Sequence, residues 1–287
     1  MRCCKMLDIP DIPEQAEVPE MPQSTELPVS PERTELQDIM ETTESASAEV
    51  QITKHQPKGV SIITATNKPE YMKQLFMNYS RQQWKSKELI ILLNNDRMNI
   101  ESYRKYAKRF GQVSVYRLPE KSPLGKCLNY GISKAKYEII AKFDDDDFYA
   151  PHYLSEAMAE FERTGANVIG KNKFYMYFRS SSKLMEASMP ARRLIAGATI
   201  MFEKRIYPGV AFSNLRKGSD MRFLHDCLKK GYKIGSTSRY NFTCIRRGNQ
   251  TKHTWKVTAR TFRILRAKTV ARTNRFSEMV SRAIPND

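Results

Sequence analysis

The sequence of 287 residues lacks the features of a membrane-spanning or a disulfide-stabilised protein. No apolar run approaches the roughly 20 residues with which a helix crosses a bilayer. The N-terminus has no apolar core of the kind that signal peptides carry. The five cysteines show no CxxC spacing, so neither a zinc site nor a disulfide framework is indicated. We therefore expect a cytoplasmic protein.

Two phosphate-handling motifs are also missing. Gly125-Lys126 is not part of a Walker loop, because the upstream glycine is absent and Cys127 follows in place of Ser or Thr. The aspartates at 144–147 do not fit the DxDx[T/V] motif of aspartate-based phosphotransferases, because Phe148 occupies the Thr or Val position. A P-loop enzyme and this class of phosphatase are therefore disfavoured.

Basic residues are in excess everywhere except near the N-terminus. Residues 1–50 contain twelve Asp or Glu and three Lys or Arg, a net charge of −9, which leaves +26 for the rest of a chain whose total is +17. A region this basic favours polyanions such as nucleotide phosphates, anionic lipid or nucleic acid. The basic residues are scattered and form no known nucleic-acid motif, so nucleic acid is an unfavoured partner.

These differences divide the chain into three predicted parts. Residues 1–56 are rich in Pro, Glu, Ser and Thr and poor in aromatics, which predicts a disordered acidic arm. Residues 57–255 carry the apolar patterns of a folded domain. Residues 256–287 form a basic amphipathic segment with apolar residues among arginines. We interpret it as a helix that lies on an anionic membrane surface or a partner, or that packs on the domain with a solvated basic face.

Within residues 57–255, apolar runs that predict strands alternate with segments of helical spacing. The predicted strands of the first half are 60–64, 89–93, 113–116 and 139–143. The predicted helices begin at Pro69, span 100–110 with a stop at Gly111, and span 124–135. This alternation favours an α/β fold with a mostly parallel, Rossmann-like sheet and helices on both faces.

The second half of this domain has a more mixed pattern, which we expect to shape the acceptor side of a site. Its predicted strands are 173–178 and 183–186, joined as a hairpin, and then 198–202, 233–236 and 241–245. A helix is predicted over 220–230, with Gly231 at its end.

Four consecutive aspartates, at 144–147, follow the apolar run at 139–143 and precede a helix that we expect to open at Pro151. Adjacent carboxylates repel one another, and a hard divalent ion such as Mg²⁺ or Mn²⁺ would share their charge. In an extended segment Asp144 and Asp146 point to one side, which makes them the metal-facing pair. A solvated acidic turn is the alternative.

The polar ends of two other predicted strands belong with the aspartates. Thr66-Asn67 ends the strand at 60–64, and Asn94-Asn95-Asp96 ends the strand at 89–93. The carboxyl ends of parallel strands meet at one edge of the sheet, where open α/β folds bind their ligands. We therefore expect a single pocket there, although each segment alone is also consistent with an ordinary turn.

Several motifs in this order resemble the family 2 glycosyltransferases with the GT-A fold. They are VSIITATNKPEYMKQLFMNYSRQQW from Val60, ELIILLNND from Glu88, LGKCLNYGISKAK from Leu124, IIAKFDDDDFYAPHYL from Ile139, and the GSD at 218–220. The similarity covers Gly59 to Trp255. Within the family, the chain looks most like bacterial enzymes that build surface or spore-coat glycans.

The resemblance implies a nucleotide-sugar donor, usually UDP-linked, bound at the strand ends. Residues of the first strand would line the nucleotide, Asp96 would contact the base, and residues 126 and 129 would border the sugar and diphosphate. The family often has Asp where this chain has Asn94 and Asn95, so the base contact differs in detail. The implied donor-binding residues are Thr64, Thr66, Asn67, Asp96, Lys126, Asn129, Asp145, Asp147 and Arg247.

The resemblance also implies a metal site and a catalytic base. Asp144 and Asp146 match the DxD motif that binds Mn²⁺ or Mg²⁺, with His253 as a further candidate ligand. Asp220 matches the base that deprotonates the acceptor hydroxyl, although a carboxylate there also suits the first turn of a helix. The neighbouring Ser219 stands where the family has Glu, and Arg247 where it commonly has His.

The function so implied is metal-dependent, inverting transfer of a sugar to a glycan or lipid-linked hydroxyl acceptor in surface glycan synthesis. We expect a cytoplasmic enzyme, peripheral at an anionic membrane. The alternative is an inactive glycosyltransferase-like scaffold that binds an anionic membrane or nucleic acid through its basic surface.

Overall fold

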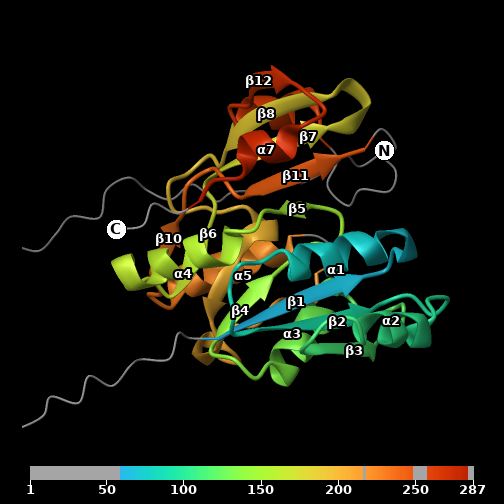
Figure 1. The fold of residues 1–287 in the computed structure, drawn as a ribbon. Helices are drawn as coiled ribbons and strands as arrows, with labels where there is room; N and C mark the ends of the chain where they lie inside the picture. Colours follow the sequence, from blue (N-terminus) through green and yellow to red (C-terminus); the bar gives the residue numbers. More distant parts are fainter. Residues whose placement is uncertain (1–58, 216–217, 248–256, 284–287) are drawn as a thin grey trace, which may run out of the picture. The chain divides into compact units, whose positions relative to one another are not determined.

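The computed structural model describes residues 59–215, 218–247 and 257–283, and these contain two sheets (Figure 1). The predicted acidic arm at 1–56 and the candidate ligand His253 lie outside the described residues. None of the helices in the described ranges is long and apolar enough to cross a membrane.

The first sheet has seven strands in the order β10-β6-β9-β4-β1-β2-β3. Its parallel part, β4-β1-β2-β3, carries the predicted strands of the first half, and β9 enters antiparallel between β4 and β6. The strands are β1 Val60–Thr66, β2 Lys87–Leu93, β3 Val113–Arg117, β4 Ile139–Lys142, β6 Val168–Gly170, β9 Met201–Glu203 and β10 Ile234–Ser236.

Helices cover both faces of this sheet, because successive residues of each strand point to opposite sides. Ile62 of β1 packs with α1, α2 and α4, whereas Ile63 packs with α3 and α5. The helices are α1 Met72–Ser80, α2 Ile100–Ala107, α3 Leu124–Lys134, α4 Tyr153–Thr164 and α5 Ser219–Lys229. The predicted α/β fold with helices on both faces is confirmed.

Two glycines inside α3 permit close packing of this helix. A Cβ at Gly125 would collide with the backbone oxygen of Ser213, and one at Gly131 would collide with the side chain of Ile63. Glycine costs helix stability, about 1 kcal/mol relative to alanine. The two glycines are nevertheless required, because α3 packs closely against β1 and against the segment before α5.

The second sheet has five strands in the order β12-β8-β7-β11-β5. Its strands are β5 Phe148–Tyr149, β7 Lys173–Phe178, β8 Lys183–Ser188, β11 Phe242–Arg246 and β12 Lys268–Arg272. The predicted hairpin is β7 and β8, joined through a 3-10 turn at Arg179–Ser181 and a left-handed Ser182. This sheet lies above the first in Figure 1, and α7 Phe276–Val280 packs on one of its faces.

The structure corrects several predicted element boundaries. The helix predicted over 100–110 ends at Ala107, and Gln112, not Gly111, has the positive φ that follows it. The strand predicted over 198–202 is β9, shortened by a 3-10 turn at Gly197–Thr199. The helix after the aspartates begins at Tyr153, because Phe148–Tyr149 first pairs with β11 as β5.

The C-terminal basic segment is not one amphipathic helix. It forms α6 Ala259–Ile264, then β12, then α7, and β12 pairs antiparallel with β8. The apolar side chains that suggested helical periodicity are shared among these elements, with Leu265 buried in the main core and Val280 buried in the core beneath α7.

Candidate active site

The candidate site lies at the carboxyl edge of the first sheet, where the order of the parallel strands reverses. β1 pairs with β2 on one side and with β4 on the other, so the chain turns in opposite directions after β1 and β4. The hydroxyl of Thr66, at the end of β1, donates a 2.5 Å hydrogen bond at this edge to Asp145 Oδ2. Open α/β sheets bind ligands at such a switch point.

The four aspartates alternate in exposure, although residues 145–147 form a turn and a bend and not the extended segment that we expected. Asp145 and Asp147 are buried, whereas Asp144 and Asp146 are partly exposed. The buried pair is fixed by the fold, since Asp145 accepts from Thr66 and Asp147 Oδ1 accepts the backbone N–H of Ile245 at 2.9 Å. Asp144 and Asp146 are therefore the two carboxylates that are most accessible to a ligand.

Burial dominates the chemistry of the two inner aspartates. Burial raises the pKa of Asp145 to about 7. The charge of Lys68 acts against this shift, and the charge of Asp146 adds to it. Burial also raises the pKa of Asp147 to about 8, with Asp146 and Asp144 adding to the effect. Adjacent like charges disfavour further ionisation. The loop thus needs cations to hold all four carboxylates in the charged form.

Two lysines supply positive charge to the outer aspartates. Lys68 Nζ, just after β1, lies 2.8 Å from Asp146 Oδ2 and 3.7 Å from Asp145 Oδ1. Lys142 Nζ, at the end of β4, lies 2.6 Å from Asp144 Oδ1. These ammonium groups occupy the positions next to the carboxylates where a bound cation would also be stabilised.

Lys142 also links the aspartate loop to Asp220. Its Nζ lies 3.4 Å from Asp220 Oδ2 and donates to the carbonyl of Gly197 at 3.3 Å. Burial lowers the pKa of Lys142, but the carboxylates of Asp144 and Asp220 outweigh it and the pKa is raised. One buried ammonium therefore joins residues that come from the loop after β4, from the turn before β9 and from α5.

Asp220 lies in the first turn of α5 with an unusual environment. Its Oδ1 is buried and has no hydrogen-bond partner among the described residues. Burial raises the pKa of Asp220, and Lys142 opposes that shift. A Cβ at position 197 would collide with this carboxylate, so Gly197 provides the space that Asp220 occupies. An unpaired buried acceptor is costly and points to a functional role.

The departure at Ser219 does not disturb Asp220. Ser219 is buried, and its hydroxyl donates to the carbonyl of Ser213 at 2.9 Å. It thereby holds the segment before α5 against the helix start. The other departure, Arg247, lies at the end of β11, where its guanidinium donates to the carbonyl of Asp146 at 3.0 Å and lies 4.5 Å from the ring centre of Tyr71.

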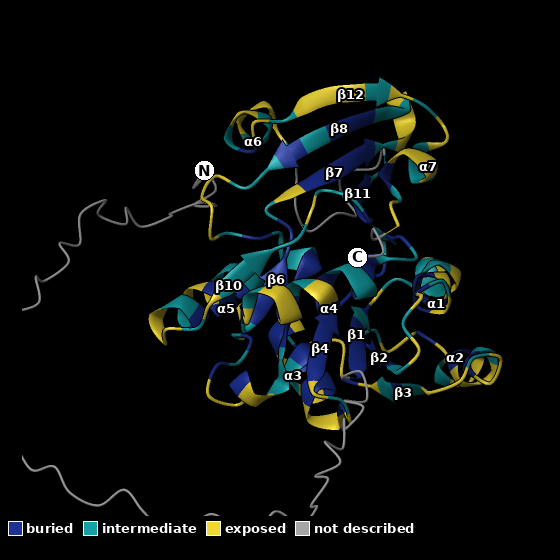
Figure 2. Ribbon diagram, turned by 60° about the vertical axis from the view of Figure 1, so that its left-hand side comes forward, coloured by how far each residue is buried: buried dark blue, intermediate teal, exposed yellow. Residues whose placement is uncertain are grey.

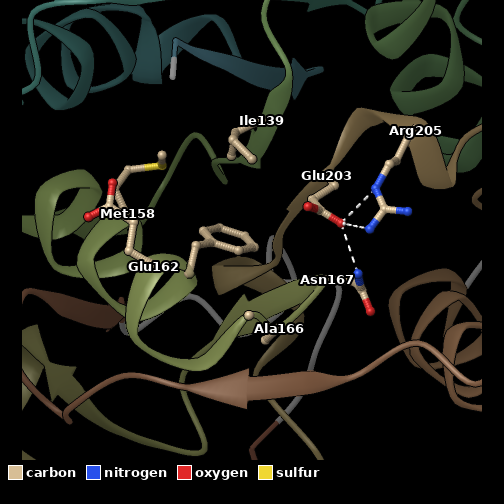
Figure 3. A pocket seen from close by; sticks show the side chains of 9 residues that line it. Ile139, Met158, Glu162, Ala166, Asn167, Glu203 and Arg205 are labelled. Atoms are coloured by element: carbon tan, nitrogen blue, oxygen red, sulfur yellow. Dashed lines mark hydrogen bonds and ion pairs between the residues drawn. The ribbon is translucent and has the colours of Figure 1, made fainter. Parts of the chain in front are cut away.

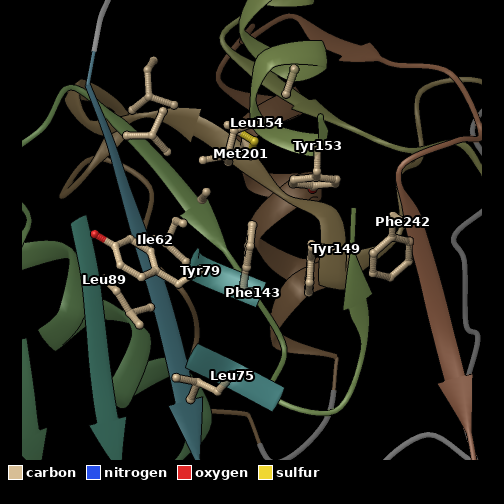
Figure 4. Close-up of a cluster of buried hydrophobic side chains, with 14 of the residues drawn as sticks. Ile62, Leu75, Tyr79, Leu89, Phe143, Tyr149, Tyr153, Leu154, Met201 and Phe242 are labelled. Atoms are coloured by element: carbon tan, nitrogen blue, oxygen red, sulfur yellow. The ribbon is translucent and has the colours of Figure 1, made fainter. Parts of the chain in front are cut away.

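Tyr149 of β5 holds the aspartate loop in place, and Figure 4 shows its ring beside that of Phe143. Its ring stacks on Phe143 with centroids 3.7 Å apart. Its hydroxyl accepts the backbone N–H of Asp144 at 2.8 Å and donates to the carbonyl of Ala198 at 2.6 Å. The phenol thus joins the loop to the turn that faces Asp220, and burial raises its pKa well above the ordinary value.

The predicted donor-binding residues are distributed around this edge of the sheet. Thr64 is buried in β1, Asn67 is exposed beyond it, and the Asn95 amide donates to the carbonyl of Asn67 at 3.1 Å. Asp96 is exposed, and its carboxylate accepts the backbone N–H of Glu120 at 3.3 Å. The structure thus brings the ends of β1 and β2 together, as expected.

The two predicted residues of α3 differ in their surroundings. Lys126 is exposed and free to reach a ligand. Asn129 instead binds the backbone of Phe212 on both sides, donating to its carbonyl at 2.8 Å and accepting its N–H at 3.0 Å. In this structure the Asn129 side chain therefore holds the segment before α5 rather than facing the candidate site with a free group.

The enclosed pocket shown in Figure 3 is not the donor site. It has a volume of about 140 Å³ and touches Ile139, at the opposite end of β4 from the aspartates. Its polar wall is closed by Glu203, which accepts from Asn167 at 2.9 Å and pairs with Arg205 at 2.7 Å. A volume this small does not hold a nucleotide sugar, since ligand pockets measure roughly 300–1,000 Å³.

The residues present fit a hard divalent ion. Asp144 and Asp146 offer carboxylate oxygens, and both already attract an ammonium group. No group of three or more His, Cys, Asp or Glu in the described ranges is arranged to hold a metal ion. The pair Asp144 and Asp146 matches the usual mode of Mg²⁺ binding, in which one or two carboxylates share the ion with substrate phosphates.

Sequence reasoning missed three residues of this site: Lys68, Lys142 and Tyr149. Lys142 interrupts an otherwise apolar strand, and a charged side chain at a buried strand position was the signal that could have identified it. Lys68 and Tyr149 sit in ordinary polar and aromatic surroundings along the chain, and only their contacts distinguish them.

Comparison with known proteins agrees with this geometry. The family model for glycosyl transferase family 2 matches residues 61–217. The chain therefore belongs to glycosyl transferase family 2. Escherichia coli WbnJ, described as an O-antigen biosynthesis glycosyltransferase, is 28% identical over 160 residues, which span 51% of this chain and 62% of WbnJ.

Solved structures share the fold at low sequence identity. S. aureus TarS 1–349 in complex with UDP-GlcNAc has a TM-score of 0.55 at 14% identity, covering 72% of this chain and 64% of that one. Mannosyltransferase PcManGT from Pyrobaculum calidifontis, in complex with GDP-Man and Mn²⁺, has a TM-score of 0.51 at 15% identity, covering 67% and 57%. The chain thus spans less than two thirds of each of these relatives, and its fold is GT-A.

Proposed function

We propose that this protein is a metal-dependent, inverting glycosyltransferase that moves a sugar from a nucleotide-sugar donor to a hydroxyl acceptor. The observation that carries the proposal is the meeting of Asp144 and Asp220 on the one ammonium group of Lys142. A metal-binding carboxylate and a base must lie close together to act on the two sides of one sugar carbon. Family membership supports the reaction class.

The carboxyl edge of the sheet suits a nucleoside diphosphate. A divalent ion held by Asp144 and Asp146 would neutralise the charge that develops on the leaving diphosphate. Lys68 and Arg247 lie beside the same aspartates, where they would contact the donor phosphates. Guanidinium groups pair well with phosphate. Thr64, Asn67, Asp96 and Lys126 are the remaining proposed donor contacts.

Asp220 is the proposed general base. Its Oδ2 is held near Lys142, its Oδ1 has no partner in the described structure, and its raised pKa brings it closer to the working pH of a base. It takes the proton of the acceptor hydroxyl while that oxygen bonds to the anomeric carbon. The bond to the diphosphate oxygen breaks on the opposite face, which inverts the configuration.

The donor and acceptor classes follow from the relatives. One solved neighbour holds UDP-GlcNAc and another GDP-Man with Mn²⁺, and the curated relative is described as acting in O-antigen biosynthesis. For this chain we propose a UDP-linked donor and a glycan or lipid-linked hydroxyl acceptor in surface polysaccharide synthesis. We propose a cytoplasmic protein that works at the membrane surface.

Calorimetric titration with UDP, with and without Mn²⁺, tests the donor site. We expect binding that requires the metal and that Asp146→Asn weakens strongly. Asp220→Asn should abolish turnover in a screen of UDP-sugars while UDP binding stays within a few-fold of the unmodified protein. Glu101→Gln, at an exposed carboxylate on α2, is the matched control and should change neither.

Equal loss of UDP binding in the Asp146 and Asp220 variants would contradict this division of roles. If neither UDP, GDP nor dTDP binds with or without metal, the enzyme assignment fails. An inactive scaffold would then be the better description.

A further inference from the structure

A second concave surface lies far along the chain from the candidate site, between α6 and β12. It has a volume of about 340 Å³ and is lined by Phe262, Arg263, Arg266, Ala267 and Lys268. Phe262 and Ala267 are half-buried, whereas the three cations are exposed. The pocket therefore combines an apolar floor with a cationic rim, and we call it the basic pocket.

The cations of the basic pocket have no carboxylate partner in the described part of the chain. None of Arg263, Arg266 and Lys268 forms an ion pair with a described residue. Two carboxylates of the same part of the fold are engaged elsewhere: Glu186, the register partner of Lys268 across the sheet, pairs with Arg239, and Glu278 lies 3.8 Å from Arg275. The positive charge of this surface is consequently not balanced by these neighbours.

Two features show that positively charged residues occupy unfavourable positions in this part of the fold. Arg266 has a φ of +48°, the left-handed conformation that glycine usually supplies after a helix. The Ala267 N–H closes the turn by donating to the Phe262 carbonyl at 2.9 Å. In the adjoining strand pair, Arg272 lies directly opposite Lys183, and like charges so placed are destabilising. A bound external anion would reduce the repulsion between Arg272 and Lys183.

We propose that the basic pocket and the outer edge of β12 bind the phosphate headgroups of an anionic lipid bilayer. Val270, at the centre of β12, has 46% of its surface exposed and can enter the interface between headgroups and acyl chains. Figure 2 shows β12 as an edge strand that is exposed along most of its length. Cationic residues around exposed apolar ones are typical of membrane-surface contacts.

A bilayer fits this surface better than nucleic acid does. Single-stranded nucleic acid is bound by aromatic faces on which bases stack. The aromatic ring of the pocket, Phe262, packs against Phe178 with centroids 5.7 Å apart and is half-buried. The proposal deepens the membrane location proposed above and does not depend on the sugar-transfer reaction.

Sedimentation of the full chain with lipid vesicles tests the proposal in the absence of any donor. The vesicles are phosphatidylcholine alone or mixed with phosphatidylglycerol. We expect binding only to the anionic vesicles. The variant Arg263→Gln, Arg266→Gln, Lys268→Gln should lower partitioning on the order of 100-fold, since each cation near a membrane contributes about a factor of five.

The matched control removes three other exposed cations, with Lys105→Gln, Lys108→Gln and Lys121→Gln. The net charge falls by the same amount, yet these positions lie on α2, just after it and before α3, so binding should change by less than about threefold. Equal losses in the two triple variants would overturn the proposal. So would equal binding of the unmodified protein to both kinds of vesicle.

Two single variants keep the test valid if the triple variant does not fold. Arg266→Gly should weaken vesicle binding while leaving the unfolding temperature unchanged or higher, because glycine suits the positive φ. Val270→Asp should also weaken vesicle binding. Unchanged vesicle binding in both variants, or a DNA shift that depends on these cations without vesicle binding, would contradict the assignment. UDP titration of each variant reports separately on the donor site.

Discussion

Two regions of this protein each bury a lysine, and they use it differently. Lys142 lies between the partly exposed carboxylates of Asp144 and Asp220, and its pKa is raised. Lys171 follows β6, where the chain passes from the first sheet to the second, and burial lowers its pKa although Glu156 opposes this. The first region concentrates charge at the candidate active site, and the second pairs a single ammonium group inside the fold.

The surroundings of Lys171 explain its structural role. Its ammonium lies 3.0 Å from Glu156 Oε2 and donates at 2.8 Å to both the Thr237 hydroxyl and the Ser238 carbonyl. Glu156 also accepts from Asn241, just before β11. Every group in this network has a partner, whereas Asp220 of the other region has an oxygen with which no described residue pairs. Complete pairing indicates a structural junction, and incomplete pairing indicates a place for a ligand.

Lys171→Met should produce the largest effect on stability. The change leaves the Glu156 carboxylate, whose side chain is only 14% exposed, without its ion-pair partner, and breaking a buried pair costs roughly 3–5 kcal/mol. Urea unfolding followed by circular dichroism measures the loss. Lys173→Met, at an exposed position two residues on, should cost less than about 0.5 kcal/mol. A small loss for Lys171→Met would show that the junction does not depend on the ion pair.

Lys142→Met should affect turnover more than stability. Asp144 and Asp220 are 39% and 26% exposed at their side chains, so water can compensate part of the lost charge. Charged hydrogen bonds are worth about 1.5–3 kcal/mol, and we expect turnover to fall on the order of 10- to 100-fold.

Lys142→Arg provides the rescue control for this variant. It should restore part of the turnover, because a guanidinium can still contact both carboxylates. If Lys142→Met loses stability as Lys171→Met does and arginine restores nothing, the two lysines have the same structural role. The measurement is donor hydrolysis with the UDP-sugar that binds, together with urea unfolding.

Gly197→Ala tests the space around Asp220. The added methyl group would collide with the carboxylate and displace it from Lys142. We expect roughly tenfold slower turnover, about 1.4 kcal/mol, with UDP binding unchanged. Gly111→Ala, where an added Cβ meets no atom within 4 Å, is the control and should leave turnover unchanged. Equal effects of the two changes would argue against a positioned base at 220.

Thr237→Val should have the smallest effect. It removes one neutral partner of Lys171 while the ion pair with Glu156 remains, and a typical hydrogen bond contributes about 0.5–1.5 kcal/mol. The unfolding midpoint in urea should fall slightly, with no change in UDP binding. A loss of stability as large as that of Lys171→Met would show that the hydroxyl of Thr237, and not the ion pair with Glu156, stabilises this junction.

Local sequence patterns predicted the parallel strands and the polar ends of those strands. Val60–Thr66 and Ile139–Lys142 are short apolar runs, and burial on both faces of a parallel sheet requires that pattern. The aspartates follow β4 directly, so their place at the ligand edge could be inferred from the chain alone. The start of α5 at Ser219, with Asp220 in its first turn, was predicted to within one residue.

Features that depend on distant partners could not be predicted. Phe148–Tyr149 becomes a strand only because β11 is there to pair with it, and β12 only because β8 offers an edge. Lys142 looked like an interruption of an apolar strand, since its second partner is far away in the sequence. Tertiary pairing decides such short segments more strongly than their own propensity does.

The width of the second sheet sets the distance between the aspartate loop and the proposed lipid-binding surface. Its outermost strands are β5, which directly follows the aspartate loop, and β12, which carries part of the proposed lipid-binding surface. Neighbouring strands are spaced about 4.8 Å apart, so the four intervals between these edges amount to roughly 19 Å. With β12 at the membrane as proposed, the sheet would act as a spacer, and an acceptor carried by a membrane lipid would have to extend about that far from the bilayer to meet the proposed donor.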